Sequence, residues 1–375
     1  MPKIVADSKI PFLRGVLEPF AEVRHLPAAQ LTREAIMDAD ALIIRTRTHC
    51  NEALLAGTRV KYIATATIGH DHIDAEYCKK AGIRWSNAPG CNAGSVMQYV
   101  ASALALIAEH DQKSFGDYVL GIIGAGHVGK KVAGLASALG MRVLINDPPR
   151  ERMEGKQGFV DLETLLAKAD MVSMHMPLYY TGPDKSHHMA DAAFFSRMKR
   201  GAWFINTARG EVADTRALTD ALLRERIRGA VLDVWESEPG IDIELLQAAT
   251  IGTPHIAGYS ADGKAMGTAM AVRAVSRFFG LGLDTWFPET LPEPENPVIH
   301  ADPNSQDPTH IMRRLFLHTY DIHHDSELLK AHPERFELFR DEYPPRREFQ
   351  AYTVRTGSCG SVVLKTISQT GFRLA

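Results

Sequence analysis

The chain has 375 residues, a length that predicts two or three domains and excludes one small domain. A formal net charge of -3 argues against a general nucleic-acid-binding protein, and an apolar fraction of 45% is enough for folded cores. The first residues lack the apolar stretch of a signal peptide, and the most apolar helical segment, 93–108, is too short to cross a bilayer, so we expect no membrane association.

The first part of the chain alternates between short apolar runs and segments of helical composition. Strands are expected at 3–6, 41–45 and 60–65, and helices at 32–37 and 52–55. Such alternation predicts a doubly wound parallel sheet, which binds ligands at the carboxyl ends of its strands. Those ends carry Arg45, Thr46, Arg47 and Thr67.

A second α/β unit begins with an apolar run at 119–123, followed by Gly124, Gly126 and Gly129 in G-x-G-x-x-G spacing. An Ala-rich helical segment and another apolar run complete a βαβ pattern. The first glycine allows a tight turn, the second lets a pyrophosphate approach the backbone, and the third lets the helix pack closely on the strand. This pattern predicts a dinucleotide-binding Rossmann domain.

Asp147 closes the second apolar run, about 20 residues after the glycines, where a carboxylate binds the ribose hydroxyls of a dinucleotide. A carboxylate at this place repels a 2′-phosphate, which favours NAD over NADP. Arg150 and Arg152 lie nearby and are the residues that could favour NADP instead.

Further strands are expected at 171–174, 202–206 and 229–234, and a long helix at roughly 262–279. The segment 286–308 contains six prolines and is expected to be a linker. Beyond it, helices at 311–320, 326–330 and 333–341 and strands at 351–354 and 362–364 predict a small α+β domain. Because its core would be marginal, we expect it to dock on a partner chain.

Three loops that follow strands of the nucleotide domain offer Arg209, Glu238 and His255. A guanidinium can bind the carboxylate of a 2-hydroxy acid bidentately. An imidazole, which ordinarily titrates near pH 6.5, can take the hydroxyl proton, and a carboxylate can orient the ring. Glu236 is the rival for this last role.

The segments GIIGAGHVGKKV, FINTARGEVADTRAL, LDVWESEP and TPHIAGYS stand in the order typical of the D-isomer-specific 2-hydroxyacid dehydrogenases. The chain resembles that family over roughly residues 1–280. The resemblance implies catalytic roles for Arg209, Glu238 and His255, and it selects Glu238 over Glu236 because the family's glutamate directly precedes the proline.

TATIGHDHID, NAPGCNAGSV and MPLYYTGPDKSHH, with the additional C-terminal domain, resemble the branch of this family that oxidises 4-phospho-D-erythronate to 2-oxo-3-hydroxy-4-phosphobutanoate for pyridoxal phosphate synthesis. That resemblance implies a small phosphorylated hydroxy acid as substrate and a homodimer formed by the C-terminal domain. It implies substrate contacts from Thr46, Thr67 and Tyr259. The implied NAD contacts come from the glycine loop and later strand ends: Gly124, Gly126, His127, Val128, Gly129, Asp147, Met176, Thr207, Ala208, Arg209, Asp233 and Gly258. Met176 departs from the branch, because a thioether cannot replace the hydroxyl donor that is common there.

The substrate phosphate requires cations or N–H donors. Arg45 and Arg47 flank Thr46 at a strand end, and we expect at least one of them to bind the phosphate rather than to be a surface arginine. A weaker hypothesis assigns Arg346 and Arg347 to the phosphate site of a neighbouring subunit.

Other reactive side chains have simpler interpretations. His70 and His72 have metal-ligand spacing but no further ligands nearby, so turn or surface histidines and no metal are expected. The four cysteines are far apart, which predicts reduced thiols in a cytoplasmic protein: Cys50, Cys78, Cys91 and Cys359. Cys91 has no recognisable base and is not expected to be a nucleophile.

Two alternatives to the phosphorylated-acid dehydrogenase remain open. The first is a related dehydrogenase for 3-phosphoglycerate or an unphosphorylated acid, which would often carry a βαββαβ regulatory domain that the C-terminal sequence does not show. The second is a non-catalytic NAD-sensing protein, which the intact set of Arg209, Glu238 and His255 disfavours.

The expected architecture is therefore α/β, with two doubly wound parallel sheets and a small α+β C-terminal domain. A Rossmann NAD domain, 99–258, is inserted in a flavodoxin-like substrate domain formed by 1–98 and 259–285. The linker 286–308 then leads to a dimerisation domain, 309–375.

Overall fold

The computed structural model describes residues 1–301, 305, 307–357 and 359–375. The chain forms two compact units, and each is described by itself. The first unit contains Met1–Asn92 and Ser260–Pro292, and the second contains Ala93–Tyr259 and Glu293–Ala375. We call 293–375 the C-terminal region.

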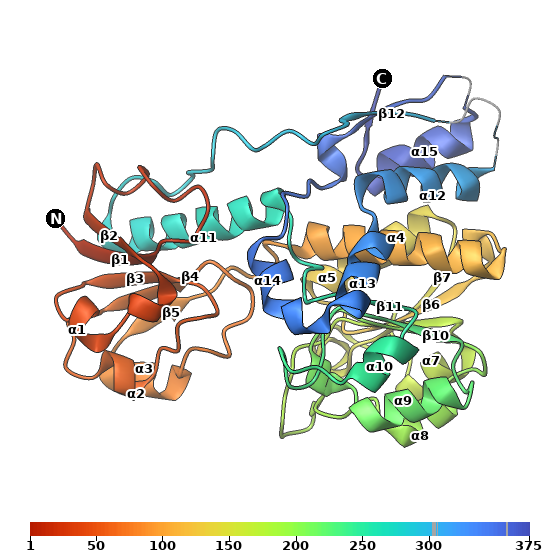
Figure 1. The fold of residues 1–375 in the computed structure, drawn as a ribbon, viewed down its shortest axis with the longest axis horizontal. Coiled ribbons are helices and arrows are strands. Elements are labelled where there is room, and N and C mark those ends of the chain that lie inside the picture. The colour runs from red at the N-terminus through yellow and green to blue at the C-terminus, as the bar shows by residue number, and fades with distance from the viewer. Residues whose placement is uncertain (302–304, 306, 358) are drawn as a thin grey trace. The chain divides into compact units, whose positions relative to one another are not determined.

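The first unit is built on a five-stranded parallel sheet in the order β2-β1-β3-β4-β5 (Figure 1). Its strands are β1 (Lys3–Asp7), β2 (Glu22–Leu26), β3 (Ala41–Ile44), β4 (Tyr62–Thr65) and β5 (Arg84–Ser86). Its helices are α1 (Arg33–Ile36), α2 (Glu52–Leu55), α3 (Ala75–Ala81) and α11 (Ala261–Phe279). This is the flavodoxin-like order, which confirms the predicted architecture. β2 and β5 were not predicted, because their sequences are largely polar.

Both faces of this sheet are covered. Side chains of alternate strand residues, such as Ile43 and Ala64, pack with Val272 and Val275 of α11 on one face. Those of the opposite parity, including Ile63, pack with α1, α2 and α3 on the other. Strands that are buried on two sides are mostly apolar, which is why β3 and β4 could be predicted from the sequence.

The second unit contains a six-stranded parallel sheet in the order β11-β10-β9-β8-β6-β7. Its strands are β6 (Val119–Ile123), β7 (Arg142–Asn146), β8 (Met171–Met174), β9 (Trp203–Asn206), β10 (Gly229–Leu232) and β11 (Ile251–Gly252). Beyond β7, the N–H of Val160 donates to the carbonyl of Ile145 at 2.8 Å. From β7 to β10 the strands follow the order 2-1-4-5-6 of a Rossmann fold, and Val160 bonds beyond β7, where strand 3 of that fold lies.

Helices pack on both faces of this second sheet. One face is covered by α4 (Ala93–Asp111) and α5 (His127–Ala138), whose buried residues pack against Leu120 and Ile122 of β6. Ile123, of opposite parity, faces the other helices. These are α7 (Leu162–Lys168), α8 (Ala192–Arg197), α9 (Thr215–Leu223) and α10 (Ile243–Ala248), whereas α6 (Pro148–Glu154), after β7, buries no residue.

The described residues of the C-terminal region add a three-stranded parallel sheet, β12-β13-β14, and four α-helices. They are β12 (Val298–His300), α12 (Pro308–Thr319), α13 (Ile322–Ala331), α14 (Phe336–Asp341), β13 (Thr353–Arg355), α15 (Ser361–Thr370) and β14 (Arg373–Leu374). β12 lies inside the segment that was expected to be an irregular linker. The predicted strand at 362–364 is wrong, because Val363 and Ile367 recur at helical spacing and are buried on one face of α15.

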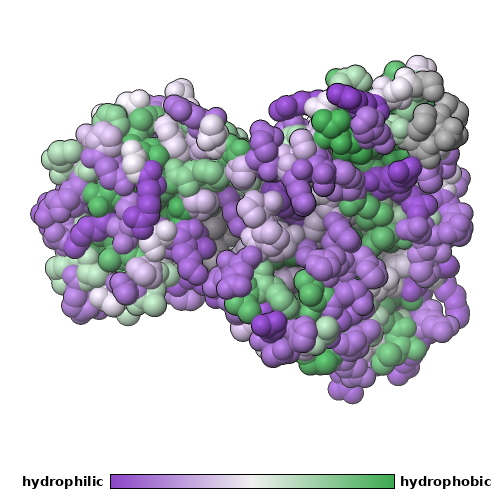
Figure 2. Space-filling model, turned by 45° about the horizontal axis from the view of Figure 1, so that its top comes forward, coloured by the Kyte–Doolittle hydropathy of each residue, from purple (hydrophilic) through white to green (hydrophobic). Residues whose placement is uncertain are grey.

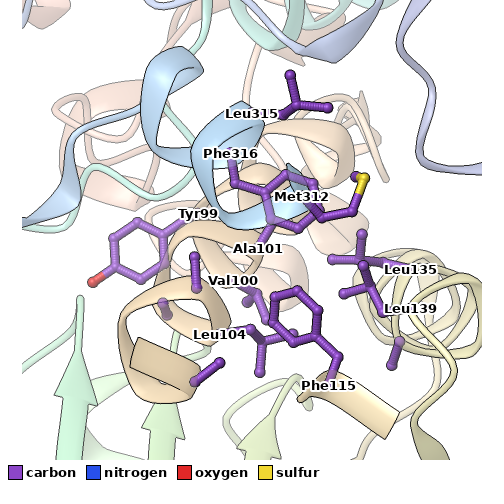
Figure 3. Packing of buried hydrophobic residues seen from close by; sticks show 14 of the residues in the cluster. Tyr99, Val100, Ala101, Leu104, Phe115, Leu135, Leu139, Met312, Leu315 and Phe316 are labelled. Atoms are coloured by element: carbon purple, nitrogen blue, oxygen red, sulfur yellow. The ribbon is translucent and has the colours of Figure 1, made fainter. Parts of the chain in front are cut away.

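The C-terminal region has no separate core. Met312 and Phe316 of α12 pack on Leu104 of α4 and lie in one cluster with Leu135 of α5 (Figure 3). Three polar bonds join α4 to the same region, for example from Gln98 Nε2 to the carbonyl of Arg347 at 2.8 Å. A domain of this size has too small a core to be stable alone, and packing on α4 and α5 of the same unit stabilises the C-terminal region.

The visible surface of each unit is largely hydrophilic, with separate hydrophobic patches (Figure 2). Among the helices of the described residues, none combines the length and the apolar composition that a membrane span requires.

Candidate active site

The glycine loop after β6 has the three steric features that its sequence predicts. A Cβ on Gly124, whose φ is +87°, would lie 2.7 Å from the backbone nitrogen of Met176. A Cβ on Gly129 would lie 2.0 Å from the carbonyl oxygen of Gly124. At Gly126 no heavy atom of the described structure lies within 4 Å of the added Cβ. The first and third glycines are therefore required for packing, and the second leaves open space for a ligand.

Helix α5 begins directly at this open space. Gly126 is its N-cap and offers no side chain to the first N–H groups, and His127 and Val128 are the first residues of the helix. Uncapped N–H groups and the helix dipole together favour a bound phosphate. The loop and the helix start therefore fit the pyrophosphate of a dinucleotide.

Asp147 follows β7 and faces the glycine loop. Its carboxylate accepts from the N–H of Ala125 at 2.7 Å and from the N–H of Arg150 at 3.0 Å, and its side chain is buried. A carboxylate accepts about four hydrogen bonds, so acceptor capacity remains for two ribose hydroxyls.

The arginines that could have favoured NADP are paired within the chain. Arg150 binds Glu154 through Nε at 2.8 Å and Nη2 at 2.6 Å, and its Nη1 donates to the carbonyl of Ala125 at 2.7 Å. Arg152 Nη2 donates to Asp184 at 2.5 Å. A 2′-phosphate would have to break these pairs, which supports NAD.

The loops after β8 and β9 meet behind the glycine loop. His175 lies between Ser173 Oγ, 2.9 Å from Nε2, and Thr207 Oγ1, 3.3 Å from Nδ1. Burial lowers the pKa of His175 to about 3, so the imidazole is neutral at physiological pH. Met176 is half-buried and Ala208 is buried beside these residues.

The lowered pKa of His175 predicts a loss of stability in acid. Below pH 6.5 His175 becomes protonated in the unfolded chain but stays neutral in the folded chain. Its contribution to the free energy of unfolding is therefore full above pH 6.5 and is lost as the pH falls from 6.5 toward 3. Between pH 7 and pH 5 the unfolding free energy should fall by about 2 kcal/mol less in His175→Gln than in the wild type. Urea denaturation at the two pH values measures this difference. The exposed His323→Gln is the matched control and should keep the wild-type dependence.

Arg209 projects from the tight loop that follows β9. The side chain of Asn206 fixes this loop, because Oδ1 accepts from the N–H of Ala208 at 3.0 Å and Nδ2 donates to the carbonyl of Arg209 at 2.9 Å. A Cβ on Gly210 would lie 1.9 Å from the carbonyl carbon of Trp235, so this loop packs directly on the loop after β10. The half-buried guanidinium also donates to the carbonyl of Ala208 at 2.8 Å.

Glu238 and His255 form a hydrogen-bonded pair. Nδ1 of His255 donates to Oε2 of Glu238 at 2.8 Å, and Oε1 of Glu238 accepts from the N–H of Trp235 at 3.0 Å. Burial alone would raise the pKa of Glu238, but the His255 ring and the Trp235 N–H outweigh it and hold the pKa below its usual value. A carboxylate that accepts from Nδ1 leaves Nε2 as the ring nitrogen that can exchange a proton with a ligand.

The rival carboxylate points elsewhere. Glu236 Oε1 lies 2.6 Å from Nε2 of His188, and Oε2 accepts from the N–H of Thr215 at 2.9 Å, at the start of α9. The geometry therefore pairs the histidine with Glu238, as the family resemblance implies.

Asp233 organises the loop that carries His255. Its buried carboxylate accepts from Thr253 Oγ1 at 2.7 Å, from the N–H of Ile256 at 2.8 Å and from the N–H of Ala257 at 2.9 Å. Burial raises the pKa of Asp233 to about 6, and the nearby His255 side chain and the three hydrogen-bond donors oppose that rise. The sequence pattern predicts only a cofactor contact for Asp233, because these bonds depend on the three-dimensional course of the loop.

The C-terminal region contributes arginines to this neighbourhood. Arg346 is buried and donates through Nη2 to the carbonyls of Ile256 at 3.3 Å and Ala257 at 2.7 Å. The hypothesis that it reaches a neighbouring subunit is therefore corrected, because its guanidinium is enclosed within its own chain. Arg347 is buried as well. Arg340 interacts with Tyr259 and Glu238, which raise its pKa against the opposing effect of burial.

The predicted substrate residues of the first unit lie at the carboxyl ends of β3 and β4. Thr67 Oγ1 lies 2.7 Å from Thr65 Oγ1 and donates to the carbonyl of Gly69 at 3.0 Å. Thr46 and Arg47 are exposed. Arg45 differs, because its Nε donates to the fully buried Asp7 at 2.9 Å and so neutralises a buried charge.

His72 lies in a turn, as expected, but it is not on the surface. It is buried beside β4, with Nε2 3.2 Å from Thr65 Oγ1, and burial lowers its pKa to about 4. Within the described residues no group of three or more His, Cys, Asp and Glu side chains is arranged to hold a metal ion.

Two family models match the chain. Residues 106–257 match the NAD binding domain of the D-isomer specific 2-hydroxyacid dehydrogenases. Residues 290–371, which cover most of the C-terminal region, match a domain of unknown function.

Similar proteins cover nearly the whole chain. An erythronate-4-phosphate dehydrogenase of Bacteroides fragilis is 48% identical over 94% of this chain and 99% of its own length. One of Pseudomonas putida is 40% identical over 94% of each chain. Among solved structures, the D-lactate dehydrogenase of Aquifex aeolicus with NAD and lactic acid has a TM-score of 0.63 at 28% identity, over 75% of this chain and 96% of that one. The NAD+-bound 3-phosphoglycerate dehydrogenase of Entamoeba histolytica also has a TM-score of 0.63, at 25% identity, over 77% and 98%.

Proposed function

The chain belongs to the D-isomer-specific 2-hydroxyacid dehydrogenase family, and we infer that it oxidises 4-phospho-D-erythronate to 2-oxo-3-hydroxy-4-phosphobutanoate with NAD. The relatives named above support this substrate, and they cover the chain almost completely. The reaction belongs to pyridoxal phosphate synthesis, which is consistent with a cytoplasmic enzyme.

Three side chains carry the chemistry that the protein itself supplies. Arg209 binds the substrate carboxylate and polarises the C2 oxygen. Nε2 of His255 takes the C2 hydroxyl proton, because Nδ1 already donates to Glu238. The Glu238 carboxylate fixes the tautomer and stabilises the imidazolium that results. These are the roles that family membership and the observed hydrogen bonds support.

NAD, when bound, accepts the hydride from C2. The open space at Gly126 and the uncapped start of α5 at His127 and Val128 would hold its pyrophosphate, and Asp147 its ribose. Gly124 and Gly129 shape that loop. The other expected contacts, at the later strand ends, are Met176, Thr207, Ala208, Arg209, Asp233 and Gly258. We propose on this basis that the second unit binds NAD and supplies Arg209 and His255 to the substrate, and that the first unit supplies further substrate contacts.

The observation that carries the proposal is the bond from Nδ1 of His255 to Glu238, in a chain that also has an intact glycine loop. The test is reduction of NAD, followed by the near-ultraviolet absorbance of the reduced nicotinamide, with 4-phospho-D-erythronate, 3-phosphoglycerate and an unphosphorylated 2-hydroxy acid in parallel. We expect the highest kcat/KM for 4-phospho-D-erythronate. A preference for 3-phosphoglycerate would contradict the proposed substrate, and tight NAD binding without turnover of any acid would indicate a sensor.

Arg47 is the clearer of two residues proposed to bind the substrate phosphate. Because it is exposed at the end of β3, Arg47→Ala should raise KM for the phosphorylated acid about tenfold or more and leave KM for an unphosphorylated acid unchanged. Steady-state kinetics with both acids measure the difference. Equal effects on the two acids would contradict this role.

Arg45→Ala is expected to behave differently. Removing the partner of Asp7 leaves a buried charge unpaired, which should cost roughly 3 kcal/mol of stability. A change in KM in this variant therefore counts only after thermal unfolding has shown that the protein is folded. Arg45→Lys, which keeps the charge, is its matched control.

We also propose a homodimer formed through the C-terminal region. Val298, Val362 and Leu374 are apolar and exposed there, and β12 and β14 are the two edges of the small sheet. Sedimentation analysis of the full chain tests this, and a monomer at micromolar concentration would contradict it.

A further inference from the structure

The C-terminal region covers the sheet edge that leads to the His255 loop. β11 is the last strand of the six-stranded sheet, so one row of its backbone groups has no neighbouring strand. The N–H of Gly252 instead donates to Ser326 Oγ of α13 at 3.0 Å. Lys330 Nζ, from the same helix, donates to the carbonyl of Ala249 at 2.6 Å. The segment 249–252, which leads to His255, is therefore hydrogen-bonded to the C-terminal region.

The two residues that follow His255 are hydrogen-bonded on both their N–H and their carbonyl sides. The N–H groups of Ile256 and Ala257 donate to the carboxylate of Asp233, and their carbonyls accept from the guanidinium of Arg346. His255 directly precedes these peptide groups and has a φ of +57°, a conformation that residues other than glycine rarely adopt. Opposite charges thus clamp the two peptide groups beside a strained catalytic residue.

Arg346 is itself fixed by its surroundings. Its guanidinium carbon lies 4.1 Å from the ring centroid of Tyr320 and 5.9 Å from that of Tyr343. Both phenols donate to Asp325, at 3.0 Å and 2.8 Å, so the aromatic rings cannot easily rotate away. A buried cation is stable only where groups of this kind compensate its lost hydration. All of these residues belong to the C-terminal region.

We propose that the C-terminal region completes the active site, and that Arg346 is the positioning residue that holds the His255 loop in its reactive conformation. This gives a role in catalysis to a segment that matches a domain of unknown function. The proposal rests on the proposed function for its kinetic consequence, but the ordering of the loop by Arg346 does not depend on which acid is oxidised.

The test compares three variants of the full chain. Arg346→Met removes the two hydrogen bonds and keeps much of the side-chain volume. Arg346→Lys keeps the charge and donors that can reach the carbonyls. Arg355→Met, at an exposed arginine of β13, is the matched control. Each is measured for kcat and KM, for NADH affinity by fluorescence, and for amide hydrogen exchange of peptides that span 251–259.

Arg346→Met should lower kcat about tenfold or more, because a small displacement of a catalytic group has effects of this size. The dissociation constant for NADH should rise by a smaller factor than kcat falls, because the glycine loop is untouched and only the contact expected from Gly258 lies in the loosened segment. Hydrogen exchange should accelerate in 251–259 and remain unchanged in peptides of α5. Arg346→Lys should have a higher kcat and slower hydrogen exchange in 251–259 than Arg346→Met. Arg355→Met should match the wild type in both quantities.

Three results would overturn the proposal. One is a kcat of Arg346→Met, per folded molecule, within about twofold of the wild type. Another is unchanged exchange in 251–259. The third is a lysine variant no better than methionine, which would show that the donors are irrelevant. If no hydroxy acid is a substrate, the proposed function fails, and the exchange data alone still decide whether Arg346 orders the loop.

Discussion

Replacing His255 by alanine should lower kcat for oxidation of the phosphorylated acid by about 10²-fold or more, with NAD affinity retained. The imidazole is the group proposed to take the hydroxyl proton, and Nε2 is available because Nδ1 is bound to Glu238. Glu238→Gln should lower kcat at least about tenfold, because an amide cannot stabilise the imidazolium. Steady-state kinetics and NADH fluorescence titration measure the two quantities separately.

The neighbouring glutamate provides the control. Glu236 stands two residues from Glu238 and has the same charge, but its carboxylate binds His188 and the N–H of Thr215. Glu236→Gln should therefore keep kcat within about twofold of the wild type. Near-normal turnover of His255→Ala, or an equal loss of kcat in the two glutamate variants, would refute the catalytic roles proposed for His255 and Glu238.

Gly129→Ala should abolish measurable NAD binding and lower the unfolding free energy by at least about 2 kcal/mol. The new Cβ would lie 2.0 Å from the carbonyl oxygen of Gly124, and backbone atoms at that place cannot move without distorting the loop. Gly126→Ala should separate the two effects. It meets no heavy atom within 4 Å, so the fold should be kept, while the methyl group occupies the space proposed for the pyrophosphate.

The matched control for both is Gly134→Ala, in the same helix. Gly134 is exposed and nothing lies within 4 Å of its added Cβ, so the variant should bind NAD normally and gain roughly 0.5–1 kcal/mol of stability. Thermal unfolding measures the stability of the three variants, and NADH titration measures their cofactor affinity. Normal NAD binding by Gly126→Ala would contradict the pyrophosphate site.

The parts of the fold that the sequence predicted well are those with a strong local pattern. β3, β4, β6 and β8 consist mostly of apolar residues because both faces of their sheets are covered, and the glycine spacing has a steric cause within one loop. β2, in which polar residues outnumber Val23 and Leu26, has no such pattern, and its place beside β1 is decided by strand pairing. The apolar run at 362–364 fits a strand and a helix equally well over three residues, and its packing made it part of α15.

Site residues divide in the same way. Arg209, Glu238 and His255 were recognisable because each follows a strand in a characteristic motif, and the structure adds the bond between the last two. Asp233 was expected as a cofactor contact, and its bonds to the His255 loop were not foreseen. Arg45 was expected to bind phosphate, but no sequence pattern could reveal that Asp7, 38 positions earlier, is its buried partner.

The sequence by itself determined two parallel-sheet units, the dinucleotide loop and the three side chains that we propose for catalysis, because each is encoded within a few consecutive residues. Only the tertiary structure decided that the C-terminal region shares its core with the nucleotide unit and that Arg346 binds the peptide groups next to His255. Contacts between residues some 90 positions apart depend on how the chain packs, and they cannot be predicted from side-chain type and local spacing.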